Sequence, residues 1–264
     1  MRTPTFYIPH GGGPCFFMDW EPADTWHKTA DWLRNLHQSW PTKPAAIVVI
    51  SAHWETEQVT VNSGAAPPLL FDYYGFPPHT YALTWPAPGE PALAQRILHL
   101  LRAAHIPCAE DDQRGFDHGV FVPFKLIDPE AKIPTVQLSL CADLDPARHI
   151  AIGAALQTLR DENVVIIGSG QSYHNMAGFK SGNPCIRESD TFDTWLTEAC
   201  LLPPTERNHQ LCHWRTAPMA AHSHPREEHL LPLMVIAGAA GDDSGKHIFR
   251  DRVMGATVSG FQFG

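Results

Sequence analysis

The stretch AAIVVISAHWE at residues 45–55 begins with six consecutive apolar residues and then becomes polar. Valine and isoleucine dominate its centre. An uninterrupted apolar run of this kind is typical of a parallel strand that is buried on both faces of a sheet. We therefore predict a central strand that ends at Ser51, Ala52 and His53.

Segments with the character of strands and of helices alternate on both sides of this strand. The predicted strands cover residues 5–9, 133–140 and 164–170, and the predicted helices cover 26–36, 91–105 and 145–163. Such alternation is typical of domains in which helices cover a largely parallel sheet. The sequence therefore predicts an α/β fold, a sandwich with a mostly parallel central sheet flanked by helices, in a single domain over residues 1–264.

Two further regions fall outside this alternation. The C-terminal runs 246–254 and 256–264 have the character of strands joined by a short turn around Gly255, so we expect an antiparallel pair at one edge of the sheet. Residues 63–91 are rich in proline, glycine and aromatic residues, which indicates a long irregular excursion. This excursion forms either one wall of a pocket or a surface loop with packed rings.

Composition excludes several classes of protein. The chain has 44% hydrophobic and 18% charged residues, which is typical of a globular protein. Its formal net charge is −9 and it has no block of Lys and Arg, so we expect no nucleic-acid partner. No apolar stretch is long enough for a membrane span, and we expect a cytoplasmic protein. The sequence is compatible with a homo-oligomer but does not indicate the number of subunits.

Histidines stand where the predicted strands end. His10 follows the strand 5–9, His53 ends the central strand, and His174 comes shortly after the strand 164–170. Because the carboxyl ends of parallel strands meet at one edge of a sheet, we expect these imidazoles to lie close together. Neutral imidazole is a ligand for Fe, Zn, Cu and Ni, so the pattern predicts a metal site.

Two more histidines are candidates for this site. His118 lies in the segment GFDHG, which we interpret as a tight turn flanked by glycines, and His229 starts an apolar helical run. The glycines that follow His10 would let backbone and substrate approach the metal closely.

The segment HGGG at residues 10–13 has a second interpretation. In α/β hydrolases such a segment supplies the backbone donors of an oxyanion hole. That fold also needs a serine with glycine at both the −2 and +2 positions, and no serine here has both. Ser172 comes nearest and lacks the second glycine, so the sequence favours the metal-site interpretation.

Six segments occur in an order that resembles one family. They are IPHGGGP (8–14), IVVISAHWE (47–55), GFDHGVFVP (115–123), PTVQLSL (134–140), GSGQSYHN (168–175) and HPREEHLLPL (224–233). Together they resemble the class III extradiol ring-cleavage dioxygenases of the LigB type, and within it the single-chain branch similar to DOPA 4,5-dioxygenase. Residues 74–97 resemble the same branch, and the resemblance extends over residues 5–263.

The resemblance implies a LigB-like sandwich with a mononuclear non-haem Fe(II) site, and Zn(II) is known in that site of some members. Position by position, it implies His10, His53 and His229 as metal ligands. Other branches use a glutamate, which makes Glu228 the alternative to His229. Adjacent helical residues point about 100° apart, so we do not expect both to reach one metal.

The resemblance also implies roles for two residues beside the metal. His174 corresponds to the acid/base of the wider family, and in this branch a role as a further metal ligand stays open. His118 corresponds to a histidine near the substrate and oxygen. Aromatic residues form either a wall against the substrate ring or ordinary packing; the candidates are Tyr7, Tyr73, Tyr74 and Phe76.

The implied reaction is the insertion of both atoms of O2 into a catechol-type substrate, DOPA or another dihydroxyphenyl compound, to give a ring-opened semialdehyde. Two alternatives remain at this point: a zinc-dependent hydrolase and a non-catalytic metal-binding protein, because histidines at strand ends would serve either one. The sequence does not identify the catechol, nor whether the 4,5 or the 2,3 bond is cut.

Overall fold

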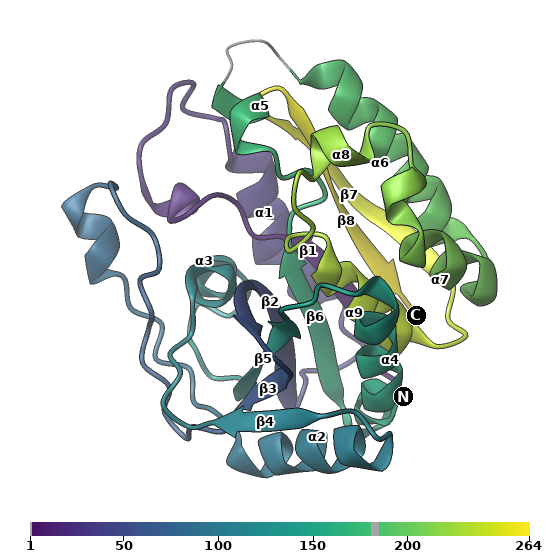
Figure 1. Ribbon diagram of the computed structural model, residues 1–264. Coiled ribbons are helices and arrows are strands. Elements are labelled where there is room, and N and C mark those ends of the chain that lie inside the picture. Colours follow the sequence, from purple (N-terminus) through teal and green to yellow (C-terminus); the bar gives the residue numbers. More distant parts are fainter. Residues whose placement is uncertain (1, 181–184) are drawn as a thin grey trace.

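A computed structural model describes residues 2–180 and 185–264. Its centre is a sheet of eight strands in the order β4-β3-β5-β2-β6-β1-β8-β7 (Figure 1). The strands are β1 Thr5–Pro9, β2 Ala46–Thr56, β3 Val59–Asn62, β4 Cys108–Asp111, β5 Thr135–Cys141, β6 Val164–Gly170, β7 Gly245–Val253 and β8 Ala256–Phe263. The sheet is mostly parallel and flanked by helices, as predicted.

Nine α-helices lie in the described part of the chain. They are α1 His27–Asn35, α2 Pro91–Ala103, α3 His118–Ile127, α4 Pro146–Leu156, α5 Met176–Lys180, α6 Ile186–Leu201, α7 Pro204–Cys212, α8 Ala220–Ser223 and α9 Leu231–Ala240. Among the described residues, no helix is both long and apolar enough to cross a bilayer.

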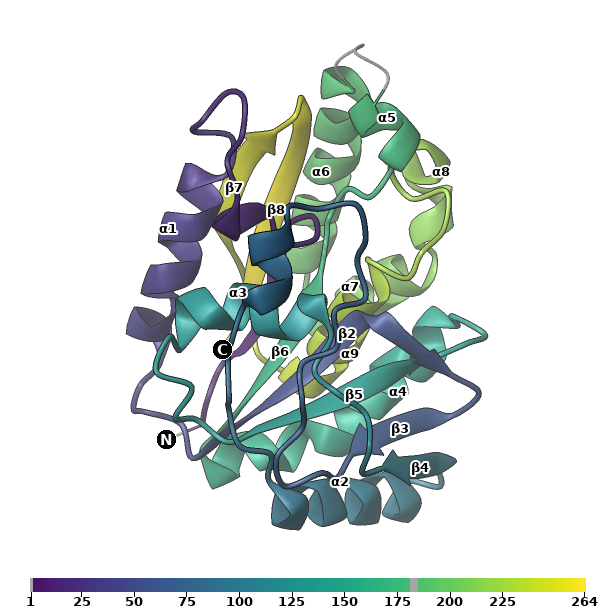
Figure 2. The same cartoon turned by 90° about the vertical axis from the view of Figure 1, so that its left-hand side faces the viewer.

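The strands β5, β2, β6 and β1 form a parallel centre, in which β6 pairs with both β2 and β1. At one edge β8 pairs antiparallel with β1 and with β7, which confirms the predicted C-terminal pair. At the other edge β3 pairs antiparallel with β5 and parallel with β4. The chain termini lie near each other in both views (Figures 1 and 2).

Alternate residues of β2 enter two separate cores, because successive side chains of a strand point to opposite faces. Val48 and Ile50 pack into the core that also contains residues of α2, α4, α6, α7 and α9. Ile47 and Val49 pack into the core on the other face, with residues of α1 and α3. The two layers of helices are visible in Figure 1. This double burial explains the unbroken apolar run of β2.

Two local predictions near the histidines are wrong. The central strand does not end at His53 but continues to Thr56. The segment GFDHG is not a turn around His118, because His118 is the first residue of α3. The carbonyl of Asp117 accepts a hydrogen bond from the N–H of Phe121, which begins this helix. Most residues after Gly119 are apolar and all but Lys125 are buried. Forming a helix between the sheet and the long loop removes these side chains from water.

Two other segments differ in detail. The predicted helix 145–163 changes after Leu156 into a 3-10 helix, Gln157–Glu162. The predicted excursion 63–91 is irregular, apart from a single β-bridge at Leu69 and a short 3-10 helix, Pro78–Ala82, and it runs beside α3.

Candidate metal centre

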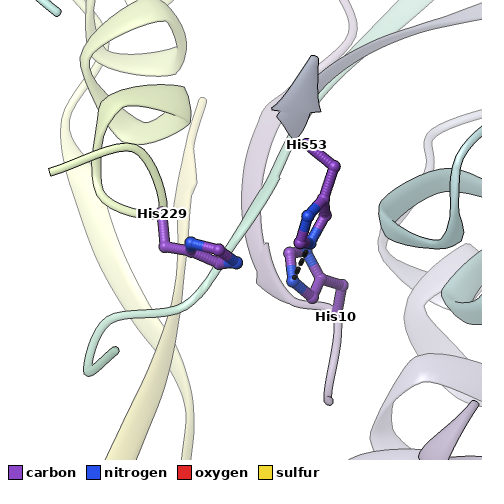
Figure 3. A group of neighbouring side chains, drawn as sticks. All are labelled: His10, His53 and His229. Atoms are coloured by element: carbon purple, nitrogen blue, oxygen red, sulfur yellow. Dashed lines mark hydrogen bonds between the residues drawn. The ribbon is translucent and has the colours of Figure 1, made fainter. Parts of the chain in front are cut away.

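Three imidazoles from three segments of the chain meet at the carboxyl edge of the sheet (Figure 3). His10 directly follows β1, His53 lies within β2, and His229 precedes α9. The Nε2 atoms of His53 and His10 are 3.2 Å apart. One ring nitrogen of each residue lies within 4.8 Å of the others, which could hold a metal ion.

An irregularity in β2 aims His53 at this point. Up to Ser51 the strand pairs with β6. Between Ile50 and Glu55 the strand advances five residues while its partner β5 advances two, from Leu138 to Leu140. Such bulges redirect side chains and are common beside active sites. The bulge therefore turns the His53 imidazole toward the neighbouring strand ends.

The hydrogen bonds of Ser169 determine which nitrogen of His10 is free. The Ser169 hydroxyl donates its single proton to the carbonyl of Gly119. Its oxygen lies 3.0 Å from Nδ1 of His10 and must therefore accept a hydrogen bond from Nδ1–H. Nε2 of His10 is left without a proton, in the form that binds a metal.

Glu228 has the same effect on His229. Its Oε1 lies 2.9 Å from Nδ1 of His229 and accepts the hydrogen bond of that nitrogen. Metal-binding histidines usually donate their second ring N–H to a carboxylate or carbonyl in this way. Glu228 lies outside the group formed by His10, His53 and His229, but with His174 and His229 it forms a second group that could hold a metal. The Glu228 carboxylate thus orients the His229 imidazole through Nδ1 and leaves Nε2 without a proton.

The nitrogens of His10 and His53 are spaced like two ligands of one divalent cation. With Nδ1–H of His10 committed to Ser169, the lone pair on its Nε2 faces Nε2 of His53 at 3.2 Å, an arrangement that needs a shared proton or cation. Metal–nitrogen bonds of about 2.1 Å at octahedral or tetrahedral angles separate two ligand nitrogens by about 3.0–3.4 Å. All the donors are imidazoles, which suits iron or zinc.

Burial lowers the pKa of all three imidazoles. Loss of hydration is the first cause for His10 and His229, and the neighbouring imidazoles lower the pKa further. Burial is also the first cause for His53, followed by His118, while the carboxylate of Asp72 acts in the opposite direction. The neutral form is therefore favoured in each case, and metal coordination requires that form.

A glycine in β6 lets the His229 segment approach the sheet. A Cβ atom on Gly170 would lie 2.1 Å from the carbonyl oxygen of His229, closer than any real contact. The same carbonyl accepts hydrogen bonds from the Tyr7 hydroxyl at 2.7 Å and from the N–H of Gln171 at 3.1 Å. These contacts hold the backbone of His229 at a set distance from β1 and β6.

His174 lies beside the group of three. Its ring stacks on that of His229, with centroids 3.4 Å apart and planes inclined by 18°. Its Nδ1 lies 3.2 Å from Oε1 of Glu228, the oxygen that also bonds His229. Glu228 therefore holds both His174 and His229.

His118 is held by Asp72, a residue that sequence reasoning missed. Oδ1 of Asp72 accepts hydrogen bonds from Nδ1 of His118 at 2.8 Å and from its backbone N–H at 3.0 Å. Oδ2 lies 4.0 Å from Nδ1 of His53. Burial acts to raise the pKa of Asp72, but the hydrogen bonds from His118 hold it below its usual range, so it is a carboxylate. No motif marks Asp72, because its loop approaches the histidines only in the folded chain.

The histidines line one cavity of about 290 Å³. Its lining residues are His10, Gly11, Gly12, Gly13, Trp20, Trp26, His53, Phe76, His118, Gln171, His174, Met176, Phe179, His229 and Met254. All five predicted histidines therefore face the same space. This size is at the small end for a ligand site and suits a single aromatic ring with a short substituent.

The four aromatic candidates for a ring wall have different positions. Phe76 lines the cavity. Tyr73 packs its ring against His118, with centroids 5.7 Å apart. Tyr7 is buried beneath His229, and Tyr74 is 91% exposed. The excursion thus contributes Phe76 to the cavity wall. Tyr7 and Tyr73 pack against neighbouring residues, and Tyr74 is exposed.

Comparison with known proteins supports a relationship over nearly the whole chain. Residues 4–262 match the family described as the catalytic LigB subunit of aromatic ring-opening dioxygenase. Dioxygenase tasH of Hapsidospora irregularis is 36% identical, over 99% of this chain and 86% of its own. Two proteins named 4,5-DOPA dioxygenase extradiol are 37% identical (Beta vulgaris; 97% of this chain, 93% of its own) and 34% identical (Escherichia coli strain K12; 90% and 85%).

The fold is also found in a solved structure. A crystal structure of an uncharacterized protein from Escherichia coli K12 has a TM-score of 0.81 at 30% identity, with 100% of both chains covered. The match in sequence and in structure thus spans the sheet and all five cavity histidines. The chain belongs to the LigB family of aromatic ring-opening dioxygenases and is an oxidoreductase, an extradiol ring-cleavage dioxygenase.

Proposed function

We propose that the chain uses one Fe(II) ion, held by His10, His53 and His229, to insert both atoms of O2 into a dihydroxyphenyl compound and give a ring-opened semialdehyde. The observation that carries the proposal is the convergence of three imidazoles with nitrogens available for a metal on a cavity of about 290 Å³. Three protein ligands on one side of a metal leave positions for substrate and oxygen. When bound, Fe(II) would relay electrons from substrate to O2, which redox-inert Zn(II) cannot do.

The roles of His174 and His118 follow from their contacts. We assign His174 as the base that takes a proton from a substrate hydroxyl and later returns one, because its Nδ1 is held by Glu228 and its ring faces the cavity. His118 has its Nδ1 engaged by Asp72, which directs Nε2 away from that carboxylate for a hydrogen bond to substrate or oxygen. Glu228 supports His229 and His174 rather than replacing His229 as a ligand.

The names of the relatives narrow the reaction. Several are called 4,5-DOPA dioxygenase extradiol, so we propose that the 4,5 bond of the ring is cut rather than the 2,3 bond. All five histidines belong to one continuous sheet and its connections, which supports a single catalytic domain over residues 1–264. All six cysteines are free, which is in keeping with a reducing compartment such as the cytoplasm.

The test of the reaction is oxygen uptake by protein reconstituted anaerobically with Fe(II) and given a panel of catechols. We expect uptake stoichiometric with a yellow ring-opened product, and no uptake by the Zn(II)-loaded protein. One bound iron per chain without uptake on any catechol would contradict the proposal and favour a zinc-dependent hydrolase.

The ligand assignment is tested by metal content. His53→Ala and His229→Ala should lose the metal and the activity together, whereas Glu228→Ala should lower metal affinity by about 10–100-fold without abolishing binding. His118→Ala and His174→Ala should keep the metal and lose rate. The exposed His99 supplies the control, since His99→Ala should change neither quantity. Retention of the metal by the His229 variant but not by the Glu228 variant would reverse the assignment.

A further inference from the structure

The cavity has two chemically distinct parts. The five imidazoles form one part, where the metal and the hydroxyl groups of a catechol would bind. The side chains of the other part are aromatic rings and thioethers: Trp20, Trp26, Phe76, Met176, Phe179 and Met254. Among the described residues that line the cavity, none is Lys, Arg, Asp or Glu. Besides the histidines, the polar groups are neutral: the amide of Gln171 and the indole N–H groups of Trp20 and Trp26. The part of the cavity beyond the imidazoles is therefore mostly apolar and has no charged side chain among the described residues.

Glycines of the N-terminal loop bring the backbone against this apolar part. Gly13 has a positive φ of 54°, and a Cβ atom there would lie 2.7 Å from the Phe76 ring. The ring of Phe76 also packs edge-on against Tyr73, with centroids 5.4 Å apart. Close packing against Gly13 and Tyr73 thus fixes the position of Phe76. Its ring therefore offers a rigid apolar surface to the cavity.

Met254 also indicates that the cavity favours apolar groups. Met254 and Gly255 form the two-residue turn between β7 and β8, both with positive φ (50° and 85°). Turns of this kind favour asparagine or aspartate before the glycine, and a large side chain with positive φ is unusual. Met254 is nevertheless 45% exposed, and Met176, which also lines the cavity, is 51% exposed. Both methionines line the cavity and offer it apolar thioether side chains.

The two cationic side chains beside the cavity, Lys28 and Arg252, are already paired. Trp20 and Met254 separate the cavity from a neighbouring hollow that contains Lys28 and Arg252. Arg252 donates to both carboxylate oxygens of Asp190 at 2.9 Å. Lys28 donates to a backbone carbonyl and lies 3.8 Å from Asp251. A carboxylate in the cavity would therefore lose hydration without meeting a free cation among the described side chains. The unpaired polar atoms that line the cavity, Nε1 of Trp26 and Oε1 of Gln171, are neutral.

We propose that this cavity selects catechols whose ring substituent is uncharged and apolar, such as a short alkyl chain, over those with the zwitterionic side chain of an amino acid. The inference rests on the function proposed above and names the substrate class of the same site. It separates this chain from its relatives named 4,5-DOPA dioxygenase extradiol. An apolar substituent gains by contact with Phe76, Phe179 and Met254. The hydration that a charged substituent loses is replaced only by neutral polar groups such as Nε1 of Trp26 and Oε1 of Gln171.

The test compares four catechols of similar size with the Fe(II)-reconstituted protein: 4-propylcatechol, dopamine, dihydrocaffeate and DOPA. We expect kcat/KM from oxygen uptake to be at least about ten-fold higher for 4-propylcatechol than for DOPA, with the two singly charged compounds also below the neutral one. Anaerobic binding, followed by quenching of tryptophan fluorescence from Trp20 and Trp26, should give the same order without any turnover.

The outcomes separate this inference from the proposed function. Oxygen uptake with DOPA at a kcat/KM equal to or above that of 4-propylcatechol would overturn the inference and leave the proposed function standing. No uptake with any of the four, while 4-propylcatechol binds most tightly, would contradict the proposed function and support the apolar selectivity of the cavity.

A charge placed at the mouth should change the preference. Met254→Lys should raise kcat/KM for dihydrocaffeate relative to 4-propylcatechol by about ten-fold, since it supplies the missing partner. Met219→Lys is the matched control, because Met219 also has a positive φ of 60°, is 42% exposed and does not line the cavity. Equal effects of both variants would overturn the inference.

Discussion

Ser169, Glu228 and Asp72 each hold Nδ1 of one site imidazole: those of His10, His229 and His118 respectively. An imidazole carries one proton in its neutral form, so a bond to Nδ1–H leaves Nε2 with a lone pair. At the scale of single residues, the chemistry of the centre thus depends on three oxygen acceptors as much as on the histidines.

Asp72 is the residue whose role is easiest to isolate, because it contacts His118 without belonging to the group of three imidazoles. Asp72→Asn removes the negative charge and weakens the hold on His118. We expect kcat to fall by about 10–100-fold while the metal stays bound. Oxygen-uptake kinetics and iron analysis of the same samples measure the two effects.

Asp112→Asn is the matched control for this variant, because Asp112 is exposed and bonds only the neighbouring Gln113 among the contacts described. It should retain full kcat. If Asp72→Asn loses iron in proportion to activity, Asp72 supports the metal group through His53 instead of positioning His118.

At the scale of elements, the site depends on how closely the segment before α9 approaches β6. The glycine at position 170 permits this approach, because its missing Cβ leaves room for the carbonyl of His229. The bulge in β2 has a comparable effect on His53. Both are properties of how two elements pack, and neither is a property of one element alone.

Gly170→Ala should therefore disturb the metal centre although it removes no polar group. The added Cβ would lie 2.1 Å from the His229 carbonyl, so that backbone must move and carry its imidazole with it. We expect the affinity for Fe(II) to fall by at least about ten-fold and the thermal midpoint to fall as well. Metal titration and thermal unfolding measure these changes.

The control is Gly75→Ala, in a loop where an added Cβ would meet no atom within 4 Å but φ is 77°. It should cost about 1–2 kcal/mol of stability from backbone strain and leave metal affinity unchanged. Normal metal affinity in Gly170→Ala would show that the approach of His229 to β6 does not set the geometry of the site.

At the scale of the whole molecule, buried neutral histidines couple folding to pH. His224 is fully buried between the rings of Phe192 and Trp214. Burial lowers its pKa to about 4, from an ordinary value of 6.5. Between these values the unfolded chain binds the proton and the folded chain does not, so the free energy of unfolding falls as the pH falls.

For the metal-free protein, we expect His224 to account for a loss of at most about 3 kcal/mol as the pH falls from about 6.5 to about 4. His224→Gln removes the titrating group and should flatten this part of the profile, as measured by urea unfolding at several pH values. His99→Gln, at an exposed position, should leave the slope as it is. Identical slopes for His224→Gln and the unchanged protein would refute the assignment.

The elements that sequence reasoning predicted are those with a strong periodic or apolar signal, such as β2, β6 and α2. Among the elements it missed, β4, α6 and α7 lack that signal. Strand β4 consists of Cys108–Asp111, with two acidic residues and no fully buried side chain, and it exists because β3 offers an edge to pair with. Helices α6 and α7 contain many polar residues, and packing against the sheet and α9 sustains them.

The sequence by itself determined the α/β class, the parallel centre of the sheet and the five histidines, because apolar runs and motifs are local features of a chain. The tertiary structure alone decided that Asp72 and Glu228 support the imidazoles, that β2 bulges at His53, and that apolar side chains from four segments line the rest of the cavity. These contacts join residues far apart in the chain, and only the packing of the layers brings them together.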